Sequence, residues 1–407
     1  MLTTIKIVSF FQILLNRRFV FRSAVFLFCG CVVAASNAQQ ESAKADQIES
    51  LQQKFDELQI EFRNVVFEVQ KAGVTYLNEP TIDQADPYLK KFDEFTAKGN
   101  EILDRWVAVG KSLFNAKLAA DKEIDDDLMY FVTKIMARNF NRDEFEAAYQ
   151  LAERLVDLNP ENLFAEIYRA RAGLLTNRFG KKITYTLERN KEQLGQEDFL
   201  SHVEAMMVGS VYFLKAEFEK EQEIRKRESD ADDLPRVKFV TNKGEFIIEL
   251  FENEAPETVG NFISLIESGH YNGLVFHTVI HHTAAETGAL DEDLKPRLVD
   301  YTIYDEHLKP NARKIFAGSV VMNNGGENLA NTRFFVSLGS LVQLNGTQTV
   351  FGRIISGMDS VYKLNKTFEI VEGTQRPIDD VVPDKIVSAT VLRKRNHEYK
   401  PRKVSRK

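Results

Sequence analysis

Apolar residues recur at intervals of three and four through the first half of the chain. The clearest run consists of Ile48, Leu51, Phe55, Leu58, Phe62, Val65 and Val69. This spacing places the apolar side chains on one face of an α-helix. We therefore predict an all-helical domain over residues 39–222. Three heptads are few for an independent coiled coil, so the helix at 48–69 is expected to pack against neighbouring helices.

The period changes to two at Val237. Residues 237–251, VKFVTNKGEFIIELF, alternate apolar and polar side chains on either side of Asn242-Lys243-Gly244, a pattern that predicts two antiparallel strands joined by a tight turn. The preceding stretch EKEQEIRKRESDADD is charged and has almost no apolar side chains. We assign residues 223–235 to a charged linker between a helical domain and a β domain.

One helical segment has a more specific pattern. Residues 143–162, DEFEAAYQLAERLVDLNPEN, place Ala148, Ala152 and Leu155 about one turn apart, and small side chains allow helices to approach closely. The segment resembles the second helix of a tetratricopeptide repeat, in which Pro160 would begin the next helix. A repeat buries its apolar face only against neighbours. The resemblance implies a helical domain that docks a protein partner or only spaces the chain.

The first 38 residues predict an export signal. A cationic stretch ends at Arg22, twelve apolar residues follow (AVFLFCGCVVAA), and Ser36-Asn37-Ala38 is a small-residue cleavage site. Twelve residues are short for a bilayer span. We expect an exported protein, in the periplasm or another extracytoplasmic space of a bacterium, that is soluble or membrane-anchored by an uncleaved N-terminus. Both cysteines lie in this segment, so the rest of the chain can form no disulfide.

The formal net charge of −7 is unevenly distributed. Residues 1–38 carry four basic side chains and no acidic one, and the last fifteen residues carry a net +7, which leaves −18 between them. A body of that charge repels phosphate, so nucleic acid is not an expected partner. Residues 396–407 are predicted to be a basic disordered tail. Membrane contact is expected only through this tail or through an uncleaved signal.

The C-terminal region contains a series of landmarks in order. They are A-P-E-T-V-x-N-F (255–262), G-x-Y-x-G-x-x-F-H-x-V-I (269–280), GSVVMNNGGEN (318–328), TRFFVSL (332–338), LNGTQTVFGRIISGMDSV (344–361) and a last strand near KIVSATVL. Residues 236–395 therefore resemble the cyclophilin-type peptidyl-prolyl cis-trans isomerase domain. The resemblance implies a multidomain α plus β protein, in which a closed eight-stranded antiparallel barrel with two helices follows the helical domain. The helices are expected at 258–267 and 356–364.

The activity implied by the resemblance is rotation about the bond before proline. Amide resonance creates the barrier to this rotation, and an enzyme lowers it by placing a cation where the twisted nitrogen gains a lone pair. Cyclophilins use an arginine for this purpose, and that position is Thr278 here. The glutamine that supports the arginine becomes Arg333, a candidate replacement cation with Glu286 as its charge partner.

The remaining groove positions are carried over motif by motif. The family's proline pocket and rim are largely replaced: the F-M-x-Q stretch falls on Thr283, Ala284 and Glu286, the alanine and asparagine that hold the peptide are Asn323 and Asn324, the rim tryptophan and histidine are Gln343 and Gln348, and only Phe335 and Leu344 are kept. Losing a methionine side chain from a binding pocket costs a few kcal/mol of apolar contact. The resemblance thus implies a degraded active site.

Three interpretations remain open. The barrel binds proline-containing peptides or proteins with weak or absent turnover, or Arg333 serves a rerouted isomerase, or the groove carries an unrelated chemistry. For the third, His277, His281 and His282 are the only histidine cluster, but neighbouring histidines point opposite ways in an extended chain, so no metal site is predicted. No cofactor is expected. A non-catalytic scaffold, with a partner docked on the tetratricopeptide-like helices, is the alternative function.

Overall fold

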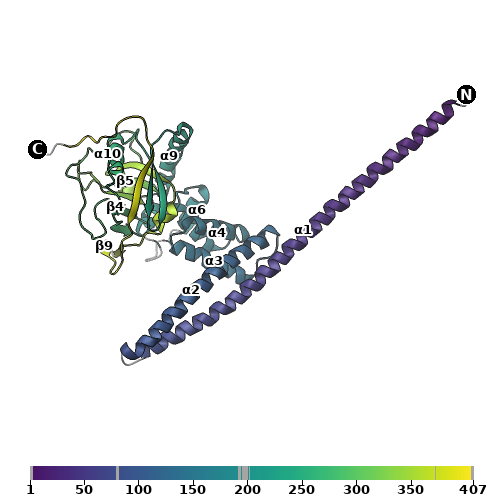
Figure 1. Cartoon of the computed structure of the whole chain (residues 1–407), viewed down its shortest axis with the longest axis horizontal. Helices are drawn as coiled ribbons and strands as arrows, with labels where there is room; N and C mark the ends of the chain where they lie inside the picture. The colour runs from purple at the N-terminus through teal and green to yellow at the C-terminus, as the bar shows by residue number, and fades with distance from the viewer. Residues whose placement is uncertain are drawn as a thin grey trace. The chain divides into compact units, whose positions relative to one another are not determined.

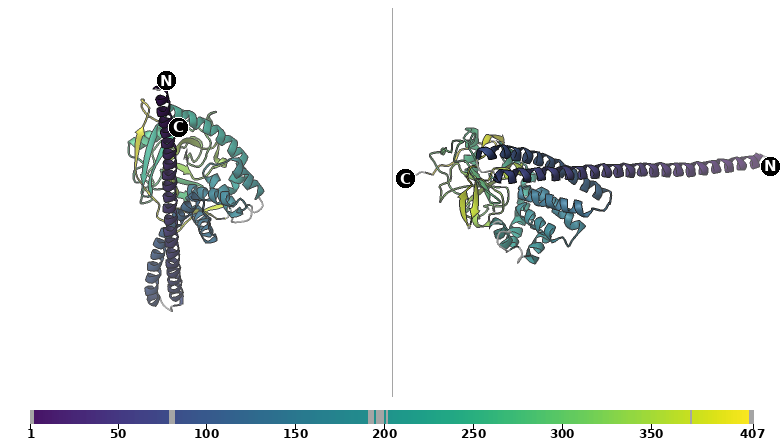
Figure 2. Two further views of the ribbon diagram at one scale, coloured as in Figure 1. Left: turned by 90° about the vertical axis from the view of Figure 1, so that its right-hand side faces the viewer. Right: turned by 90° about the horizontal axis from the view of Figure 1, so that it is seen from below.

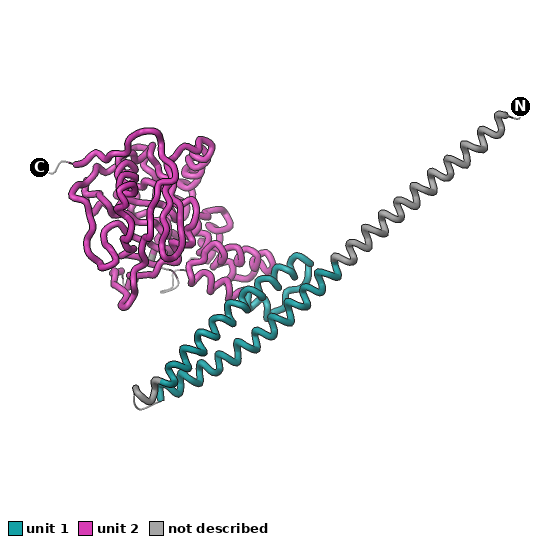
Figure 3. Tube along the Cα trace, viewed as in Figure 1, with its two compact units in different colours: residues 1–132 teal, residues 133–407 magenta. Residues whose placement is uncertain are grey.

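The computed structural model describes residues 3–78, 82–190, 194, 200, 202–371 and 373–404, and it describes only the backbone of residues 3–40, 82–86 and 202. The chain divides into two compact units, residues 1–132 and residues 133–407 (Figure 3). The first unit is helical, and the second contains helices and a β-sheet.

Most of the described helices precede the sheet in the chain (Figure 1). They are α1 (Thr3–Asn78), α2 (Ile82–Ala119), α3 (Asp126–Asn141), α4 (Phe145–Leu158), α5 (Leu163–Leu175), α6 (Lys181–Arg189), α8 (His202–Gly209) and α9 (Val211–Ala231). Two helices belong to the β region, α10 (Pro256–Glu267) and α11 (Met358–Tyr362). The predicted helical N-terminal region is confirmed.

In the first unit, α1 and α2 lie side by side (Figure 2). Leu58 and Val65 of α1 pack with Ile102 of α2 in a small buried cluster. The Trp106 ring lies 4.2 Å from that of Phe131, centroid to centroid. The apolar face of 48–69 therefore packs on a neighbouring helix, as expected, because burial of that face stabilises it more than helix propensity does.

The described part of the second unit contains one sheet of ten strands. The strands are β1 (Arg236–Thr241), β2 (Gly244–Leu250), β3 (Thr278–Ile280), β4 (Ala284–Thr287), β5 (Ser319–Met322), β6 (Phe334–Ser337), β7 (Thr349–Ser356), β8 (Phe368–Val371), β9 (Thr374–Pro377) and β10 (Ile386–Arg393). Their order is β10-β1-β2-β7-β5-β6-β4-β3-β8-β9. The predicted hairpin at 237–251 is present as β1 and β2, with Thr241 opposite Gly244.

The prediction of eight strands closed into a barrel is not confirmed. Among the described residues the sheet ends at β10 on one side and at the β8–β9 hairpin on the other. Backbone hydrogen bonds from Gly273 to Ile386, from Ile386 to Leu274 and from Phe276 to Asp384 join β10 to the segment before β3. These isolated bonds tie the edge down without a continuous ladder.

Aromatic side chains fill the inner face of the sheet. Phe262 of α10 lies 4.9 Å from Phe351, 5.1 Å from Phe334 and 5.9 Å from Phe239, ring centroid to ring centroid. Each buried phenylalanine contributes roughly 1.5–3 kcal/mol of transfer free energy. This core positions β4 and β6, on which the candidate site lies.

The helices from α4 onward share this core instead of forming a separate domain. One continuous cluster of buried residues runs from Phe140 in α3, through Phe145 in α4, to Ala389 in β10 and Tyr399. The side-chain amide of Asn177 donates to the carbonyl of Ala317 at 2.9 Å and accepts from its N–H at 3.0 Å. The predicted packing face of α4 is confirmed, since its alanines Ala148 and Ala152 are buried. The tetratricopeptide assignment stays a prediction.

The charged segment assigned to a linker is instead mostly helix. Residues 211–231 form α9, and its Glu221 and Glu228 are buried. Both carboxylates bind the guanidinium of Arg313, which is 1% exposed, and Glu228 also binds Arg353 at 2.8 Å. The sequence pattern misleads here because the inward face of α9 carries carboxylates, which are buried by pairing with arginines and not by apolar contact.

The basic tail is also ordered as far as the structure describes it. Tyr399 is 6% exposed, and its hydroxyl donates to Glu252 at 2.8 Å. The N–H of Val404 donates to the carbonyl of Thr302 at 2.8 Å, and the Lys403 ammonium lies 4.0 Å from the Tyr301 ring centroid. The prediction of a disordered tail over 396–407 is therefore wrong for residues 396–404, because a buried tyrosine, a backbone hydrogen bond and a cation–π contact anchor them.

The predicted export signal, residues 1–38, lies outside the residues whose side chains are described and stays a prediction. Among the described residues, none of the helices combines the length and apolar composition needed to cross a membrane.

Replacing Arg313 by leucine leaves two buried carboxylates without their shared partner. We expect Arg313→Leu to lower the free energy of unfolding by about 3–5 kcal/mol, because removing one member of a buried ion pair strands the other. The matched control is Lys226→Ala, which breaks the exposed Lys226–Asp230 pair of α9. It should lower the free energy of unfolding by at most about 0.5 kcal/mol. Urea unfolding followed by circular dichroism compares them; equal losses would contradict the assigned role.

The same network predicts a dependence of stability on pH. Burial raises the pKa of Glu221, but hydrogen bonds and charge from Arg313 outweigh burial, and the net pKa is lowered. The ionised Glu221 carboxylate therefore stabilises the fold fully above pH ~4.5, and this stabilisation is lost as the pH falls through the lowered pKa of Glu221. Between pH 5 and 3, wild type should lose up to about 1.4 kcal/mol per pH unit more than Glu221→Gln does. The exposed control Glu223→Gln should follow wild type.

Candidate functional site

The groove positions carried over from the sequence lie on neighbouring strands. Thr278 begins β3, Glu286 lies in β4 and Phe335 lies in β6. Strand pairing places Thr278 directly opposite Glu286, Glu286 opposite Phe335, and Phe335 opposite Val321 of β5. Directly opposed residues of antiparallel strands project from the same face of a sheet. The four side chains therefore form one row across the strands.

Residues two positions away, on these strands or immediately beside their ends, extend this face, and the N–H of Asn323 donates to the carbonyl of Arg333 at 3.0 Å. Arg333 precedes Phe335 by two, Asn323 follows Val321 by two, and Ala284 precedes Glu286 by two. The structure thus brings together most of the central groove positions predicted from the motifs. We call Thr278, Ala284, Glu286, Asn323, Arg333 and Phe335 the groove face.

The guanidinium of Arg333 is bound to Glu286. Arg333 Nε donates to Glu286 Oε1 at 2.9 Å, and a terminal nitrogen lies 2.8 Å from the same oxygen. The side chain of Asn323 donates to this oxygen too, at 2.8 Å. The expected charge pair is therefore present, and its exposed fractions are 39% for Arg333 and 15% for Glu286. The one cation on the groove face is largely neutralised by its neighbour.

The next segment of the groove is a hydrogen-bonded loop. The N–H of Asn324 donates to the side chain of Gln348 at 3.2 Å, and the Asn324 amide donates to the carbonyl of Thr347 at 3.1 Å. Asn323 accepts from the N–H of Gly325 at 3.2 Å. Asn323, Asn324 and Gln348 consequently belong to one local network that shapes the backbone beside Glu286.

The other predicted positions lie farther along the loops. Gln343 and Leu344 belong to a short 3₁₀ helix, η1 (Val342–Leu344); Gln343 is exposed, and Leu344 is half-buried against the main core. Thr283 lies in the turn before β4, where its hydroxyl donates to the carbonyl of His281 at 3.1 Å. The two positions thus carry a hydroxyl group at Thr283 and a methyl group at Ala284.

His277 lies next to the groove face, and the charges of Glu286 and Arg333 affect its pKa. Its Nδ1 is 3.0 Å from the Thr278 hydroxyl. Burial lowers the pKa of His277, while the negative charge of Glu286 raises it and the positive charge of Arg333 lowers it again. The net pKa is below the usual histidine value. The imidazole is therefore expected to be neutral at pH 7.

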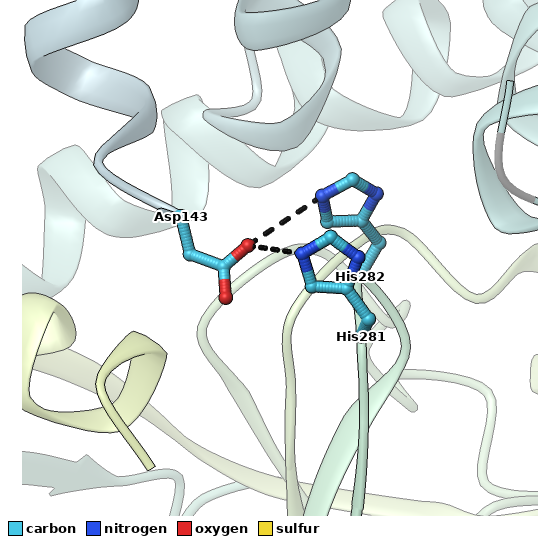
Figure 4. Close-up of side chains that lie close together, drawn as sticks. All are labelled: Asp143, His281 and His282. Carbon is cyan, nitrogen blue, oxygen red and sulfur yellow. Dashed lines mark hydrogen bonds and ion pairs between the residues drawn. The ribbon is translucent and has the colours of Figure 1, made fainter. Parts of the chain in front are cut away.

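His281 and His282 do not diverge as the sequence analysis expected. His282 has a φ of 56°, in the left-handed region, so the chain turns there instead of continuing extended. The two imidazole rings stack at 3.8 Å, centroid to centroid. Both Nε2 atoms face Asp143, which lies between α3 and α4 (Figure 4). The expectation of opposite directions is wrong because it assumed a strand at a turn.

Charges of both signs surround this cluster. Lys366 binds Asp143 Oδ2 at 2.6 Å, and Glu204 Oε2 lies 3.3 Å from Nδ1 of His282. Burial raises the pKa of Asp143, but His281, His282 and Lys366 together bring it well below its usual value. Burial alone would lower the pKa of His282, whereas the two carboxylates raise it.

Sequence reasoning missed Asp143, Glu204 and Lys366. Asp143 is 138 residues from His281 in the chain, and Glu204 lies in a separate helix. The adjacent histidines at 281 and 282 were the only local signal, since no spacing rule connects them to an aspartate in the helical region.

Comparison with known proteins decides the family of this chain. The family profile described as cyclophilin type peptidyl-prolyl cis-trans isomerase/CLD matches residues 236–391. Peptidyl-prolyl cis-trans isomerase-like 1 of Aspergillus oryzae is 33% identical over 159 residues, which are 38% of this chain and 94% of that protein. The chain belongs to the cyclophilin-type peptidyl-prolyl cis-trans isomerase family.

Other relatives are similar over the same fraction of the chain. Peptidyl-prolyl cis-trans isomerase-like 3 of Homo sapiens is 34% identical over 152 residues, 36% of this chain and 90% of that protein. A solved cyclophilin type isomerase of Cryptosporidium parvum has 25% sequence identity and a TM-score of 0.32, covering 39% of this chain and 97% of that one. We refer to residues 236–391 as the cyclophilin region.

The charges of Arg333 and Glu286 on the groove face predict that two variants shift the pKa of His277 in opposite directions. Arg333→Gln removes a positive charge near His277, so the pKa of His277 should rise. Glu286→Gln removes a negative charge, so the same pKa should fall. NMR titration of the imidazole signals measures both, with His277→Gln to assign the resonance.

His397 provides the control, because its carboxylate partner is Glu252 and neither variant changes that pair. Its titration should be the same in all proteins. Shifts of His277 in the same direction in both variants would contradict the arrangement of charges described above.

Proposed function

We propose that the cyclophilin region binds proline-containing segments of client proteins and that its isomerase turnover is weak or absent. The observation that carries this proposal is the pairing of Arg333 with Glu286 beside Thr278. Membership of the cyclophilin family supports proline-containing segments as the ligands. The charges on the groove face support weak or absent isomerase turnover.

The rate argument rests on the transition state. Rotation about the bond before proline takes tens to hundreds of seconds unaided. A catalyst must bind the twisted amide more tightly than the planar one. Thr278 offers a neutral hydroxyl where the family uses a cation, and a hydroxyl interacts far more weakly with a developing lone pair than a full charge does.

Arg333 does not restore the missing cation. To face a substrate amide, its guanidinium would have to leave Glu286, which also accepts from Asn323. Glu286 stands where the F-M-x-Q stretch of the family has a neutral glutamine. Its negative charge offsets the positive charge of Arg333, so the Arg333–Glu286 pair presents little net charge to the groove. The rerouted-isomerase interpretation requires that this pairing break, and the geometry of Glu286 weighs against it.

Binding is supported by the apolar remainder of the groove face. Phe335 is retained and is 6% exposed, and Ala284 is half-buried beside it on β4. The smaller Ala284 side chain offers less contact than a methionine would. We therefore expect weak binding of proline peptides, with Phe335 as the main apolar contact.

Restoring the family's charges should restore turnover. In a protease-coupled proline-peptide assay, wild type should stay close to the uncatalysed rate. The double variant Thr278→Arg/Glu286→Gln should accelerate isomerisation at least about tenfold, which corresponds to about 1.4 kcal/mol of transition-state stabilisation. Robust wild-type turnover that persists in Arg333→Ala would overturn the proposal; turnover that Arg333→Ala abolishes would support the rerouted enzyme.

Binding is measured separately on the same proteins. Chemical-shift changes on titration with a proline peptide should be reduced in Phe335→Ala. They should be unchanged in Leu308→Ala, an apolar side chain that is 82% exposed. Equal binding of the proline peptide by Phe335→Ala and Leu308→Ala would show that Phe335 does not contact the peptide.

A further inference from the structure

A cluster outside the groove face has the composition of a metal site. Among the described residues, Asp143, His281 and His282 each offer one ligand atom, and these atoms lie within 4.8 Å of one another. Two are imidazole nitrogens from the β3–β4 turn, and the third is a carboxylate oxygen from the α3–α4 turn (Figure 4).

One of the two ligand distances suits a shared ion as it stands, and the other would have to lengthen. Zn²⁺ binds imidazole nitrogen and carboxylate oxygen at about 2.0–2.2 Å, which places two ligands of a tetrahedral ion about 3.3 Å apart. His282 Nε2 lies 3.6 Å from Asp143 Oδ1. His281 Nε2 lies 2.5 Å from the same oxygen as a hydrogen bond, and its side chain is 44% exposed. A small outward movement of the exposed His281 ring would therefore open the centre of the cluster.

The groups behind the three ligands hold them in position. Glu204 lies 3.3 Å from His282 Nδ1, which favours the proton on Nδ1 and leaves the lone pair of Nε2 on the side of Asp143. A carboxylate behind a metal-binding histidine is the usual arrangement in such sites. Arg171 in turn binds Glu204 at 2.8 Å, and Lys366 binds the other oxygen of Asp143. Every ligand except His281 is thus preoriented.

Two residues of the cluster have left-handed backbone conformations, which only a few per cent of non-glycine residues adopt. Asp143 has a φ of 62° and His282 a φ of 56°. Such left-handed residues persist where surrounding contacts compensate for their cost, and they are often found at functional sites. Here both conformations direct a side chain to the same point.

We propose that Asp143, His281 and His282 bind a divalent transition-metal ion of the Zn²⁺ type, which clamps the α3–α4 turn to the β3–β4 turn. The remaining coordination position faces solvent beside His281. The ion would secure the helices to the turn that leads directly into Thr283 and Ala284 of the groove.

The ligand set selects among ions. Imidazole ligands favour Zn²⁺, Cu²⁺ and Ni²⁺, whereas Mg²⁺ and Ca²⁺ require more oxygen ligands than one carboxylate supplies. Lys366 and Arg171 already balance the charges of Asp143 and Glu204. The affinity should therefore be moderate, with a dissociation constant on the order of 10 µM or tighter.

The test is Zn²⁺ titration of the tag-free full chain by isothermal calorimetry at pH 7.5. Wild type should bind one Zn²⁺, and excess Mg²⁺ and Ca²⁺ should not compete. His281→Ala and Asp143→Asn should each weaken binding at least about tenfold. Asparagine tolerates the left-handed backbone at position 143, and His281 is exposed, so both variants are expected to fold.

The matched control is His397→Ala, which removes another histidine paired with a carboxylate. It should bind Zn²⁺ like wild type. Co²⁺ should give the visible absorption bands of a tetrahedral site in wild type and not in His281→Ala. The proposal is overturned if wild type shows no stoichiometric binding, or if both ligand variants retain wild-type affinity. These readouts are independent of isomerase turnover, so either proposal can fail alone.

Discussion

The burial of Arg313 between carboxylates of α9 is the constraint on which the second unit depends. A guanidinium that is 1% exposed is stable only when acidic partners surround it, and Glu221 and Glu228 supply them. Arg353 extends the network from Glu228 to Glu249 on β2. The charged face of α9 is thereby held against the sheet. Helices that a pattern analysis assigns to a separate domain become part of the same core as the cyclophilin region.

One consequence is that the helices contact the turn between β3 and β4. With α9 held on the sheet, and Asn177 bonded to Ala317, the α3–α4 turn comes within hydrogen-bonding distance of the β3–β4 turn. Asp143 meets the two histidines that immediately precede Thr283. A residue from outside the cyclophilin region therefore contacts the β3–β4 turn, which leads directly into β4.

The groove itself combines a retained framework with altered electrostatics. Strand register aligns Thr278, Glu286 and Phe335 in one row, and that register follows from buried aromatic side chains that the substitutions leave in place. A carboxylate at position 286 then neutralises the nearest cation. The sheet thus keeps Phe335 on the groove face, while the cation nearest to Thr278 is paired with Glu286.

The amino-acid sequence by itself determined the cyclophilin family, the β1–β2 hairpin and the helix at α10, because these depend on local patterns and motifs in order. It also indicated Glu286 as the partner of Arg333, since both lie in aligned motif segments. The tertiary structure alone decided that α9 is buried, that residues 396–404 are ordered, and that Asp143 lies against His281 and His282. Buried ion pairs join residues with no fixed spacing in the chain, and the direction of the His282 ring depends on a single backbone torsion, so neither can be read from periodicity.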